Sequence, residues 1–475
     1  MNNFSGTTVA FSTLKPMHVS KNLFCPQAEH ELAAAAFAKA LKEASGAVRL
    51  AKKTSNLFRE RKKGQNALSA KSFARTIFVD VKEGFADVQG MCTFEDFTDA
   101  CLAYGCFPAV VPELKTITVG GAVSGVGIEA TSFRHGFVHE AVLEMEVLCG
   151  DGEIRVCRAD NEFSDLFFAI PNSYGSLGYI LRLRYKVIPA RYSVKATYTR
   201  FSYRENFLQA IGEACSGSGD FVEGVCFAPS KYTLVTAQLC DKKPNTNIYG
   251  EIPYYKRLQC KNEAVLSMRD WLWRWDPDWF WCSRFYGMEN PFLRFIGLFG
   301  DPPFMLQSKT YWKILSWWRR NKMEEKLNIL RKKFGKEEHL AEFVIQDVEI
   351  PFDKCPEFLD FYEENIKIHP FWICPLVPQE NADKWTLYSM KPGELHLNFG
   401  FWHTVAVSKD TPRGFVNRKL EQEVTRLGGR KSLYSDCYFP ENEFWNIYNG
   451  KAYKKIKDKY DPDGRFADLY KKICR

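Results

Sequence analysis

The stretch of sequence that constrains this chain most is ITVGGAVSGVGIE, which runs from residue 117 to residue 129. It places four glycines and a serine within nine positions of a chain that is otherwise rich in aromatic and β-branched residues. Glycine lets another group approach the backbone closely, and a run of bare N–H groups forms a concave site for a phosphate or a flat ligand. A tight turn with a purely architectural role is the alternative, although four glycines are more than one turn needs.

Two common phosphate-binding loops do not fit this stretch. A Rossmann loop needs a helix directly after its glycines, whereas the sequence up to residue 140 stays polar and broken and then predicts a strand. A Walker loop needs Gly-Lys followed by Ser or Thr, and no such triplet follows here. A second glycine turn, NSYGSLGYI, lies at residues 172–180. Two such turns in one domain could enclose a single extended ligand, such as FAD.

Composition indicates a globular protein and excludes some functions. The chain has 475 residues, which suggests two or three structural units. A share of 15% aromatic residues calls for an apolar pocket or a lipid-facing surface. The net charge of +8 comes without the basic stripe and stacking aromatics of a nucleic-acid binder. Basic clusters at 59–64, 317–322 and 331–336 indicate solvated surface, or attraction to an anionic membrane or cofactor.

Cysteine spacing and hydropathy bear on metals and location. The 15 cysteines are scattered, without a Cys-x-x-Cys pair or zinc-ligand spacing, so we expect reduced thiols and no metal site. The N-terminus lacks the pattern of a signal peptide, and no apolar run reaches the length of about 18 residues that spans a membrane. We therefore expect a cytoplasmic protein or one peripheral to an intracellular membrane. The segments 290–306 and 369–378 could enter a membrane interface.

Periodicity and capping residues predict an α+β protein. The pattern of the sequence changes near residue 190, which indicates a domain boundary there. Helices are expected at 28–45 and 93–105, the second with Thr93 as its N-cap. Strands are expected at 47–52, 76–81, 86–91, in a hairpin at 141–158, after the second glycine turn up to 190, and at 342–351, 394–402 and 433–439. The last residues predict a helix and an Asp-Pro-Asp-Gly turn.

Several runs resemble one known family. VVPELKTITVGGAVSGVGIEATSFRHGF (110–137) and SDLFFAIPNSYGSLGYI (164–180) resemble the PCMH-type FAD-binding domain of the vanillyl-alcohol-oxidase superfamily. Within that superfamily the chain is most similar to the Δ24-sterol reductase branch. FVIQDVEIP, HPFWICPLVP, LYSDCYFPENEFWNIYNG and DLYKKIC agree with that branch in order and spacing, so the match runs from about residue 45 to 475.

The resemblance implies a domain organisation. A two-subdomain FAD-binding domain is expected at 1–190, and a substrate or cap domain with an antiparallel sheet at 191–425. A C-terminal segment at 426–475 is expected to return to the FAD domain. The sterol reductases begin with a membrane-spanning helix, which this sequence does not show, so the identity of the lipid is left open.

The resemblance also implies the residues that contact FAD. They lie in three segments and are Thr54, Ser55 and Asn56; Thr118, Gly120, Gly121, Ala122, Gly125, Gly127, Ile128, Ser132 and His135; and Gly175, Ser176, Gly178 and Ile180. The turn at 52–59 contains neither the His nor the Cys that attaches flavin covalently in many relatives. We therefore expect non-covalent FAD.

The expected activity is that of an FAD-dependent oxidoreductase acting on CH–CH groups, which reduces a carbon–carbon double bond in a lipid. NADPH is the expected donor, and it would use the same flavin face as the lipid in turn. Tyr434, Asp436 and His396 are the candidate catalytic residues, although each could be structural. Two alternatives stay open: an oxidase or dehydrogenase of an alcohol or sugar, and a non-catalytic flavin-fold binding protein. The sequence leaves open the choice between sterol and fatty acyl chain, the direction of reaction and the oligomeric state.

Overall fold

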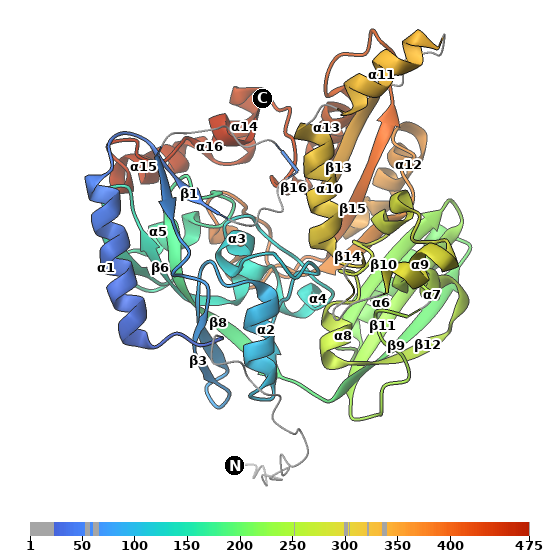
Figure 1. Ribbon diagram of the computed structural model, residues 1–475, viewed down its shortest axis with the longest axis horizontal. Helices are drawn as coiled ribbons and strands as arrows, with labels where there is room; N and C mark the ends of the chain where they lie inside the picture. Colours follow the sequence, from blue (N-terminus) through green and yellow to red (C-terminus); the bar gives the residue numbers. More distant parts are fainter. Residues whose placement is uncertain are drawn as a thin grey trace.

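The protein contains two large sheets, each covered by helices (Figure 1). The computed structural model describes residues 23–52, 58–59, 66–250, 252–298, 303, 305–320, 323–334 and 340–474. One sheet has six strands and comes from the N-terminal part of the chain, and the other has eight and comes from residues 193–431. This mixed α+β architecture confirms the fold class that the sequence predicted.

The six-stranded sheet is antiparallel and is organised around one long strand, β8. Its strands are β3 (Thr76–Asp80), β4 (Phe85–Gln89), β5 (Cys106–Pro108), β6 (Val142–Leu148), β7 (Ile154–Cys157) and β8 (Tyr179–Pro189). β8 pairs with β4, β6 and β5, so the strand that follows the second glycine turn holds this sheet together. The helices of this part of the chain are α2 (Phe94–Leu102), α3 (Val119–Val123), α4 (Ser132–His135) and α5 (Ser164–Ala169).

A smaller unit precedes this sheet. The helix α1 (Gln27–Glu43) packs beside a parallel pair of strands, β1 (Val48–Ala51) and β2 (Asn66–Ser69). α1 forms because it is rich in alanine, and it buries Ala34, Phe37 and Leu41 at helical spacing. Leu50 of β1 lines the same cavity as Gly120 and Gly121, so this unit adjoins the glycine-rich stretch.

The eight-stranded sheet has the order β12-β9-β11-β10-β14-β15-β13-β16, and all of its pairs are antiparallel. Its strands are β9 (Ser193–Phe201), β10 (Phe221–Ala228), β11 (Lys231–Cys240), β12 (Glu263–Ser267), β13 (Ala341–Pro351), β14 (Phe371–Leu376), β15 (His396–Ala406) and β16 (Arg430–Lys431).

Both faces of this sheet are buried. One face packs against α6 (Arg204–Ser216), α12 (Cys355–Asn365) and α13 (Phe415–Arg426). The other face packs against a tryptophan-rich segment and the first domain. Neighbouring residues on β14 show the alternation, because Ile373 belongs to the first core and Trp372 to the second. The aromatic surplus of the sequence is used largely in this second core.

The remaining helices lie in the tryptophan-rich insertion and in the C-terminal segment. They are α7 (Tyr254–Cys260), α8 (Met268–Leu272), α9 (Pro291–Gly297), α10 (Ser308–Arg320), α11 (Met323–Lys333), α14 (Glu441–Ile447), α15 (Gly450–Tyr460) and α16 (Leu469–Ile473). Short 3₁₀ helices occur at Val138–Ala141, Cys282–Tyr286, Phe352–Lys354 and Ala382–Lys384.

The C-terminal helices lie against the first domain, beside β1 and α5 (Figure 1). The Val48 N–H donates to the Arg465 carbonyl at 2.8 Å, and the Gly150 N–H donates to the Tyr460 carbonyl at 2.8 Å. Lys457 Nζ donates to the Ser176 carbonyl at 2.7 Å. These contacts agree with a C-terminal segment that returns to the first domain. The boundaries at residues 190 and 425 stay a prediction.

Two local predictions differ from the structure. Residues 119–123 form the short helix α3, where the sequence suggested a loop. The run 433–439 is not a strand, because it consists of turns and a single bridge from Cys437 to Cys474. Lys431 and Glu421 explain this, since Lys431 Nζ donates to the Asp436 carbonyl and the Tyr438 N–H donates to the Glu421 carboxylate. Side chains thus take hydrogen bonds that a neighbouring strand would otherwise provide.

Within the described residues, no helix combines the length and the apolar character that crossing a bilayer requires.

Candidate functional site

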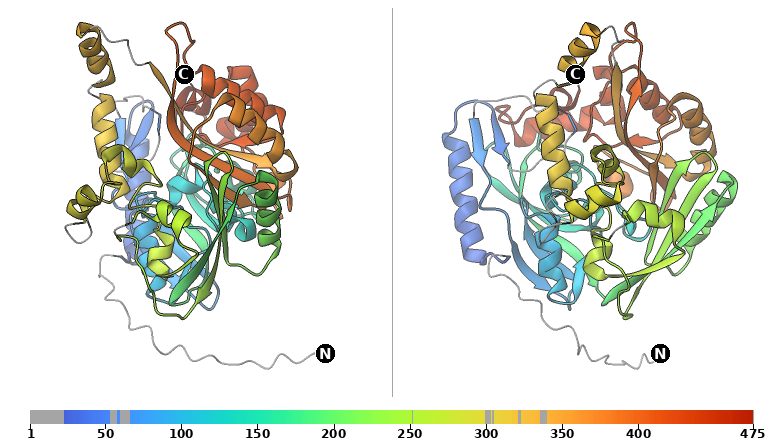
Figure 2. Two further views of the ribbon diagram at one scale, coloured as in Figure 1. Left: turned by 90° about the vertical axis from the view of Figure 1, so that its right-hand side faces the viewer. Right: turned by 45° about the vertical axis from the view of Figure 1, so that its right-hand side comes forward.

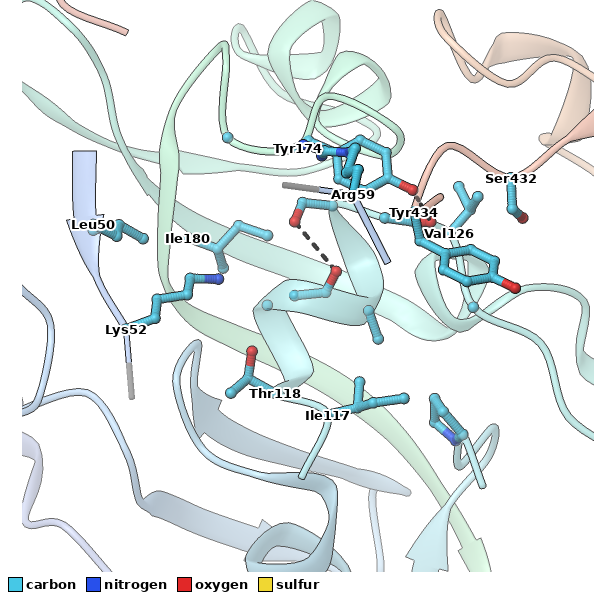
Figure 3. Close-up of a pocket in the computed structure, with 18 of the residues that line it drawn as sticks. Leu50, Lys52, Arg59, Ile117, Thr118, Val126, Tyr174, Ile180, Ser432 and Tyr434 are labelled. Carbon is cyan, nitrogen blue, oxygen red and sulfur yellow. Dashed lines mark hydrogen bonds between the residues drawn. The ribbon is translucent and has the colours of Figure 1, made fainter. Parts of the chain in front are cut away.

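A cavity of about 660 Å³ lies where the two sheets and the C-terminal segment meet. Its walls come from β1, α3, the second glycine turn, β13, β15 and the residues around 434 and 472. Figure 3 shows lining residues from β1, the glycine-rich segments and the region around 434. The volume falls in the range of about 300–1,000 Å³ that is usual for cofactor and small-molecule sites. Its lining divides into a glycine wall, a basic end and an aromatic end.

The glycine wall is built by close approach of three chain segments. The Gly120 N–H donates to the Gly90 carbonyl at 2.9 Å, and a Cβ at position 120 would lie 2.8 Å from that oxygen. A Cβ at Gly178 would lie 2.4 Å from a methyl of Val147. These glycines are required by packing, and they also leave backbone open to the cavity. The architectural role considered for the sequence is therefore observed, and the binding role stays a prediction.

Basic side chains gather along one part of the lining. They are Arg49, Lys52, Arg59, Lys471 and Lys472. Lys52 and Leu50 extend from β1 on one side of α3, and Tyr434 and Ser432 lie on the other side (Figure 3). Lys472 Nζ donates to the Tyr174 carbonyl at 2.8 Å, so the C-terminal helix holds the second glycine turn. This end of the cavity suits an anionic group such as a diphosphate.

Aromatic side chains form the aromatic end, which adjoins the basic side chains at Phe58 and Arg59. They are Phe58, Trp279, Phe280, Trp372, Trp402 and Tyr434. Phe280 stacks on Trp402 with ring centroids 4.3 Å apart, and Phe58 stacks on Trp279 at 5.6 Å. Trp279 and Phe280 have φ values of 44° and 60°, a left-handed conformation that is rare for bulky residues and clusters at functional sites. This end suits a flat ring or a hydrocarbon chain.

A polar pair stands within the aromatic end. Tyr434 Oη donates to Asp347 Oδ2 at 2.7 Å, and Trp402 Nε1 donates to Tyr434 Oη at 3.1 Å. Asn398 Nδ2 donates to Asp347 Oδ1 at 2.9 Å. Burial raises the pKa of Asp347 to about 6, although these hydrogen bonds oppose the shift, and burial raises the pKa of Tyr434 well above its usual value. The pair can therefore hold and release a proton near neutral pH.

A buried ion network joins the glycine wall to the eight-stranded sheet. Arg274 lies 2.8 Å from both the Glu129 and the Glu223 carboxylates. Trp275 Nε1 and Trp372 Nε1 each donate to Glu223 at 2.9 Å. Glu113 lines the cavity beside this network, and its pKa is raised well above normal by burial and then by Glu129. The network fixes the end of the glycine stretch against β10.

Most of the residues that the sequence predicted for cofactor contact line this cavity. They are Thr118, Gly120, Gly121, Ala122, Gly125, Gly127, Ile128, Gly175, Gly178 and Ile180, together with the catalytic candidate Tyr434. Lining a cavity does not by itself test a contact with FAD, so their roles stay predictions.

Other predicted residues are placed elsewhere. Ser132, His135, Ser176, Asp436 and His396 are not part of the cavity lining. Ser132 Oγ instead accepts from the Glu129 N–H at 3.0 Å, which supports the end of the glycine stretch. His396 Nδ1 pairs with the Glu394 carbonyl at the start of β15. Thr54, Ser55 and Asn56 lie outside the described residues.

The sequence predicted no metal site. Residue spacing alone, however, does not show which ligand-type side chains from distant parts of the sequence come together in the fold. Cys226, Glu363 and His369 bring one possible ligand atom each to within 4.8 Å of one another. His369 Nε2 lies 2.9 Å from Glu363 Oε1. Burial raises the pKa of the Cys226 thiol, which disfavours the thiolate that a metal requires.

Several lining residues escaped the sequence reasoning. Trp279, Trp372 and Trp402 reach the cavity from the second domain, and Arg59 and Lys472 reach it from segments more than 400 residues apart. Their only signal in the sequence was composition: surplus aromatic residues, and basic residues near the end of β1 and near the C-terminus.

Comparisons with known proteins agree with this geometry. A family model described as an FAD binding domain matches residues 22–158. A Delta(24)-sterol reductase of Homo sapiens is 26% identical over 415 residues, covering 84% of this chain and 75% of that protein. A Delta(24)-sterol reductase homolog of Caenorhabditis elegans is 25% identical over 429 residues, covering 84% and 77%. Cytokinin dehydrogenase 7 of Oryza sativa subsp. japonica is 34% identical over 145 residues, covering 30% and 28%.

The glycine-walled cavity and the matching family model together define a protein with a PCMH-type FAD-binding domain. More particularly, the chain is an FAD-binding oxidoreductase that is a distant homologue of the Delta(24)-sterol reductases. This confirms the resemblance that its sequence shows.

The residues of the cavity fit FAD on structural grounds. Open backbone at α3 and at the second glycine turn could contact the diphosphate, and Lys52 and Lys471 bring positive charge to the lining. The aromatic end could accept the isoalloxazine ring. Among the described residues that line the cavity there is no cysteine or histidine, which favours the non-covalent binding that we predict.

Proposed function

We propose that this protein reduces a carbon–carbon double bond in a lipid, with FAD as its cofactor and NADPH as its electron donor. The observation that carries the proposal is the Tyr434–Asp347 pair, a hydrogen-bonded unit that can hold a proton in an aromatic end suited to hydrocarbon. The likeness to Delta(24)-sterol reductases supports the same class of reaction.

Reduction of an alkene requires a hydride at one carbon and a proton at the other. FAD supplies hydride chemistry when it is bound. The protein must then supply the proton and the position of the alkene. The hydroxyl of Tyr434, which lines the cavity, can supply the proton. The stacked rings of Phe280 and Trp402 can position the alkene.

We assign the proton to a relay. With Asp347 protonated, its carboxyl donates to Tyr434 Oη, and Tyr434 Oη donates to the substrate carbon. Tyr434 stays neutral at the end of the step, and Asp347 becomes a carboxylate that the Asn398 and Tyr434 donors stabilise. This route avoids a buried tyrosinate, which the raised pKa of Tyr434 makes costly. A pKa of about 6 for Asp347 keeps part of the acid form available at neutral pH.

NADPH and lipid would use the same cavity in turn. NADPH is the first reactant, its oxidised form leaves, and the lipid then enters. The proposal covers a sterol side chain and an unsaturated fatty acyl chain alike, because an aromatic wall recognises hydrocarbon and not one head group.

An anaerobic titration tests the proposal. The purified protein is loaded with FAD, NADPH is added, and the flavin absorbance is followed; a sterol with an unsaturated side chain or an unsaturated phospholipid is then added. We expect bleaching by NADPH and recovery of the absorbance with the alkene. Bleaching by an alcohol or sugar, with no response to NADPH, would contradict the proposal.

That second outcome would favour the alternative of an alcohol or sugar dehydrogenase. The partial match to cytokinin dehydrogenase 7 supports dehydrogenase chemistry as a class, and it does not point to an alcohol or a sugar. In that reaction ionised Asp347 would accept a proton through Tyr434 instead of giving one. A protein that takes up no FAD would contradict both enzymatic readings.

A further inference from the structure

Exposed apolar side chains are concentrated in one segment of the molecule. About half of the exposed large hydrophobic residues in the described chain fall within residues 285–334, which is about a tenth of the sequence. They are Phe285, Phe292, Leu293, Phe295, Ile296, Trp317, Leu327, Ile329 and Phe334. The segment that carries α9, α10 and α11 lies along one edge of the molecule (Figure 2, left). We call these three helices the docking face.

The first helix of the docking face is fixed to the protein on its inner side. Arg294 is buried, and its guanidinium lies 2.7 Å from the Asp278 carboxylate and donates to the Gly250 carbonyl at 2.9 Å. Phe292, Phe295 and Ile296 lie at helical spacing on the outer side, and Phe292 is 69% exposed. Because Arg294 anchors this helix to the protein, the aromatic side chains on its outer side are held in an exposed position.

The docking face is also strongly basic. Among the side chains of α10 and α11 that the structure describes, six are Lys or Arg and one is Glu, a net charge of +5. On α10, Lys309, Lys313 and Trp317 share one exposed side at successive helical turns. On α11, Lys332 and Lys333 are exposed beside Phe334, which is 75% exposed. Basic helices with exposed aromatic and aliphatic residues bind the surface of anionic bilayers.

The inner side of α10 closes the aromatic end of the cavity. Trp312 lies edge-on to Phe58 with ring centroids 5.2 Å apart, and edge-on to Trp279 at 6.2 Å. Phe58 and Trp279 both line the cavity. The helix α10 therefore connects the docking face to residues that line the cavity.

We infer that α9, α10 and α11 dock on an anionic phospholipid surface. The charge of the face selects the anionic headgroups, and Phe292, Phe295 and Trp317 enter the interface. The contact places the aromatic end of the cavity next to the bilayer. It does not depend on which lipid is reduced, or on whether any lipid is.

Vesicle sedimentation without turnover tests this inference. The full chain loaded with FAD is mixed with vesicles of phosphatidylcholine alone, or of phosphatidylcholine with phosphatidylserine. We expect binding to the second kind only, and we expect added salt to weaken it, because attraction to the headgroups is screened within about 8 Å at physiological ionic strength. No binding to anionic vesicles at low salt would overturn the inference.

Matched variants locate the contact. The double variant Phe292→Ser/Phe295→Ser should lower the partition coefficient by about tenfold or more. Leu32→Ser/Phe78→Ser, which removes equally exposed hydrophobic residues of the first domain, should leave it unchanged. Lys309→Glu/Lys313→Glu should remove the preference for anionic vesicles, while Lys71→Glu/Lys82→Glu should keep it. Equal losses in both members of a pair would overturn the inference.

A second copy of this chain is the competing occupant. If the docking-face variants abolish concentration-dependent self-association and leave vesicle binding intact, the surface is a protein interface and the inference fails. Unfolding temperatures and flavin content should match those of the unaltered protein, because the altered side chains are exposed.

Discussion

Tyr434 Oη and Asp347 Oδ2 lie 2.7 Å apart, although 87 residues separate them in the sequence. Asp347 comes from the middle of β13, and Tyr434 from a turn that follows β16, the neighbour of β13 in the sheet. The pairing of these two strands thus brings the two groups together in the cavity. The proposed chemistry depends on this pair.

Removing the Tyr434 hydroxyl should slow the lipid step alone. We expect Tyr434→Phe to lower the rate of flavin reoxidation by an alkene about 10²- to 10⁴-fold, the usual contribution of one positioned acid. Reduction by NADPH should stay within a few-fold, because it needs no proton from Tyr434. Stopped-flow absorbance measures the two steps separately. Tyr192→Phe, at a half-exposed tyrosine, is the control, and equal slowing of both steps would contradict the assignment.

The lipid step should also depend on pH through Asp347. Its pKa is about 6, so the acid form that the relay needs is lost as pH rises above that value. We expect the rate to level off below about pH 6 and to fall about tenfold for each pH unit above it. Asp347→Asn should be slow and should lack this dependence. A rate that rises with pH would indicate that Asp347 acts as a base.

Glu349 should make the fold less stable at high pH. Burial raises the pKa of Glu349 to about 8, so the folded state binds more protons than the unfolded state between that value and the ordinary value of 4.5. The free energy of unfolding should therefore fall as pH rises through this window. In Glu349→Gln the fall should be smaller, as measured by urea denaturation across the range. Glu357→Gln, at an exposed carboxylate, should behave like the unaltered protein.

The glycine wall should be required for cofactor binding. In Gly121→Val a branched side chain would start 2.6 Å from Thr118 Oγ1 and crowd the lining. We expect FAD affinity to fall about tenfold or more, which corresponds to about 1.4 kcal/mol, while the eight-stranded domain stays folded. Gly219→Val is the control, because the atoms nearest to its added Cβ lie 3.8 Å away. Flavin fluorescence during titration gives both affinities, and an unchanged value for Gly121→Val would count against the wall.

Local signals in the sequence predicted the local structure well. The alanine-rich helix, the Thr93 cap and the strand that follows the second glycine turn are formed by near neighbours, so the chain itself encodes them. The prediction of a strand at 433–439 was wrong because the side chains of a buried pair, Lys431 and Glu421, form hydrogen bonds with the backbone of this run. Side-chain partners of this kind leave no periodic trace.

The candidate site was predictable only in part, for a geometric reason. His396 lies at the start of β15, whereas Trp402 reaches the cavity six residues further on, roughly 20 Å along the strand. Alternation gives the face of a residue and not its position along the strand. Trp279, Trp372 and Asp347 reach the cavity through tertiary packing between distant segments, which no local pattern encodes.

Isotope labelling of the product tests the proposed reaction most directly. The FAD-loaded protein is incubated without oxygen in D₂O with NADPH and an unsaturated lipid, and the lipid is analysed by mass spectrometry. We expect a saturated product in which one new hydrogen is deuterium from the solvent and the other derives from NADPH. In Tyr434→Phe the incorporation of solvent deuterium should be slower or absent. An unchanged alkene, together with oxidation of an added alcohol, would contradict lipid alkene reduction.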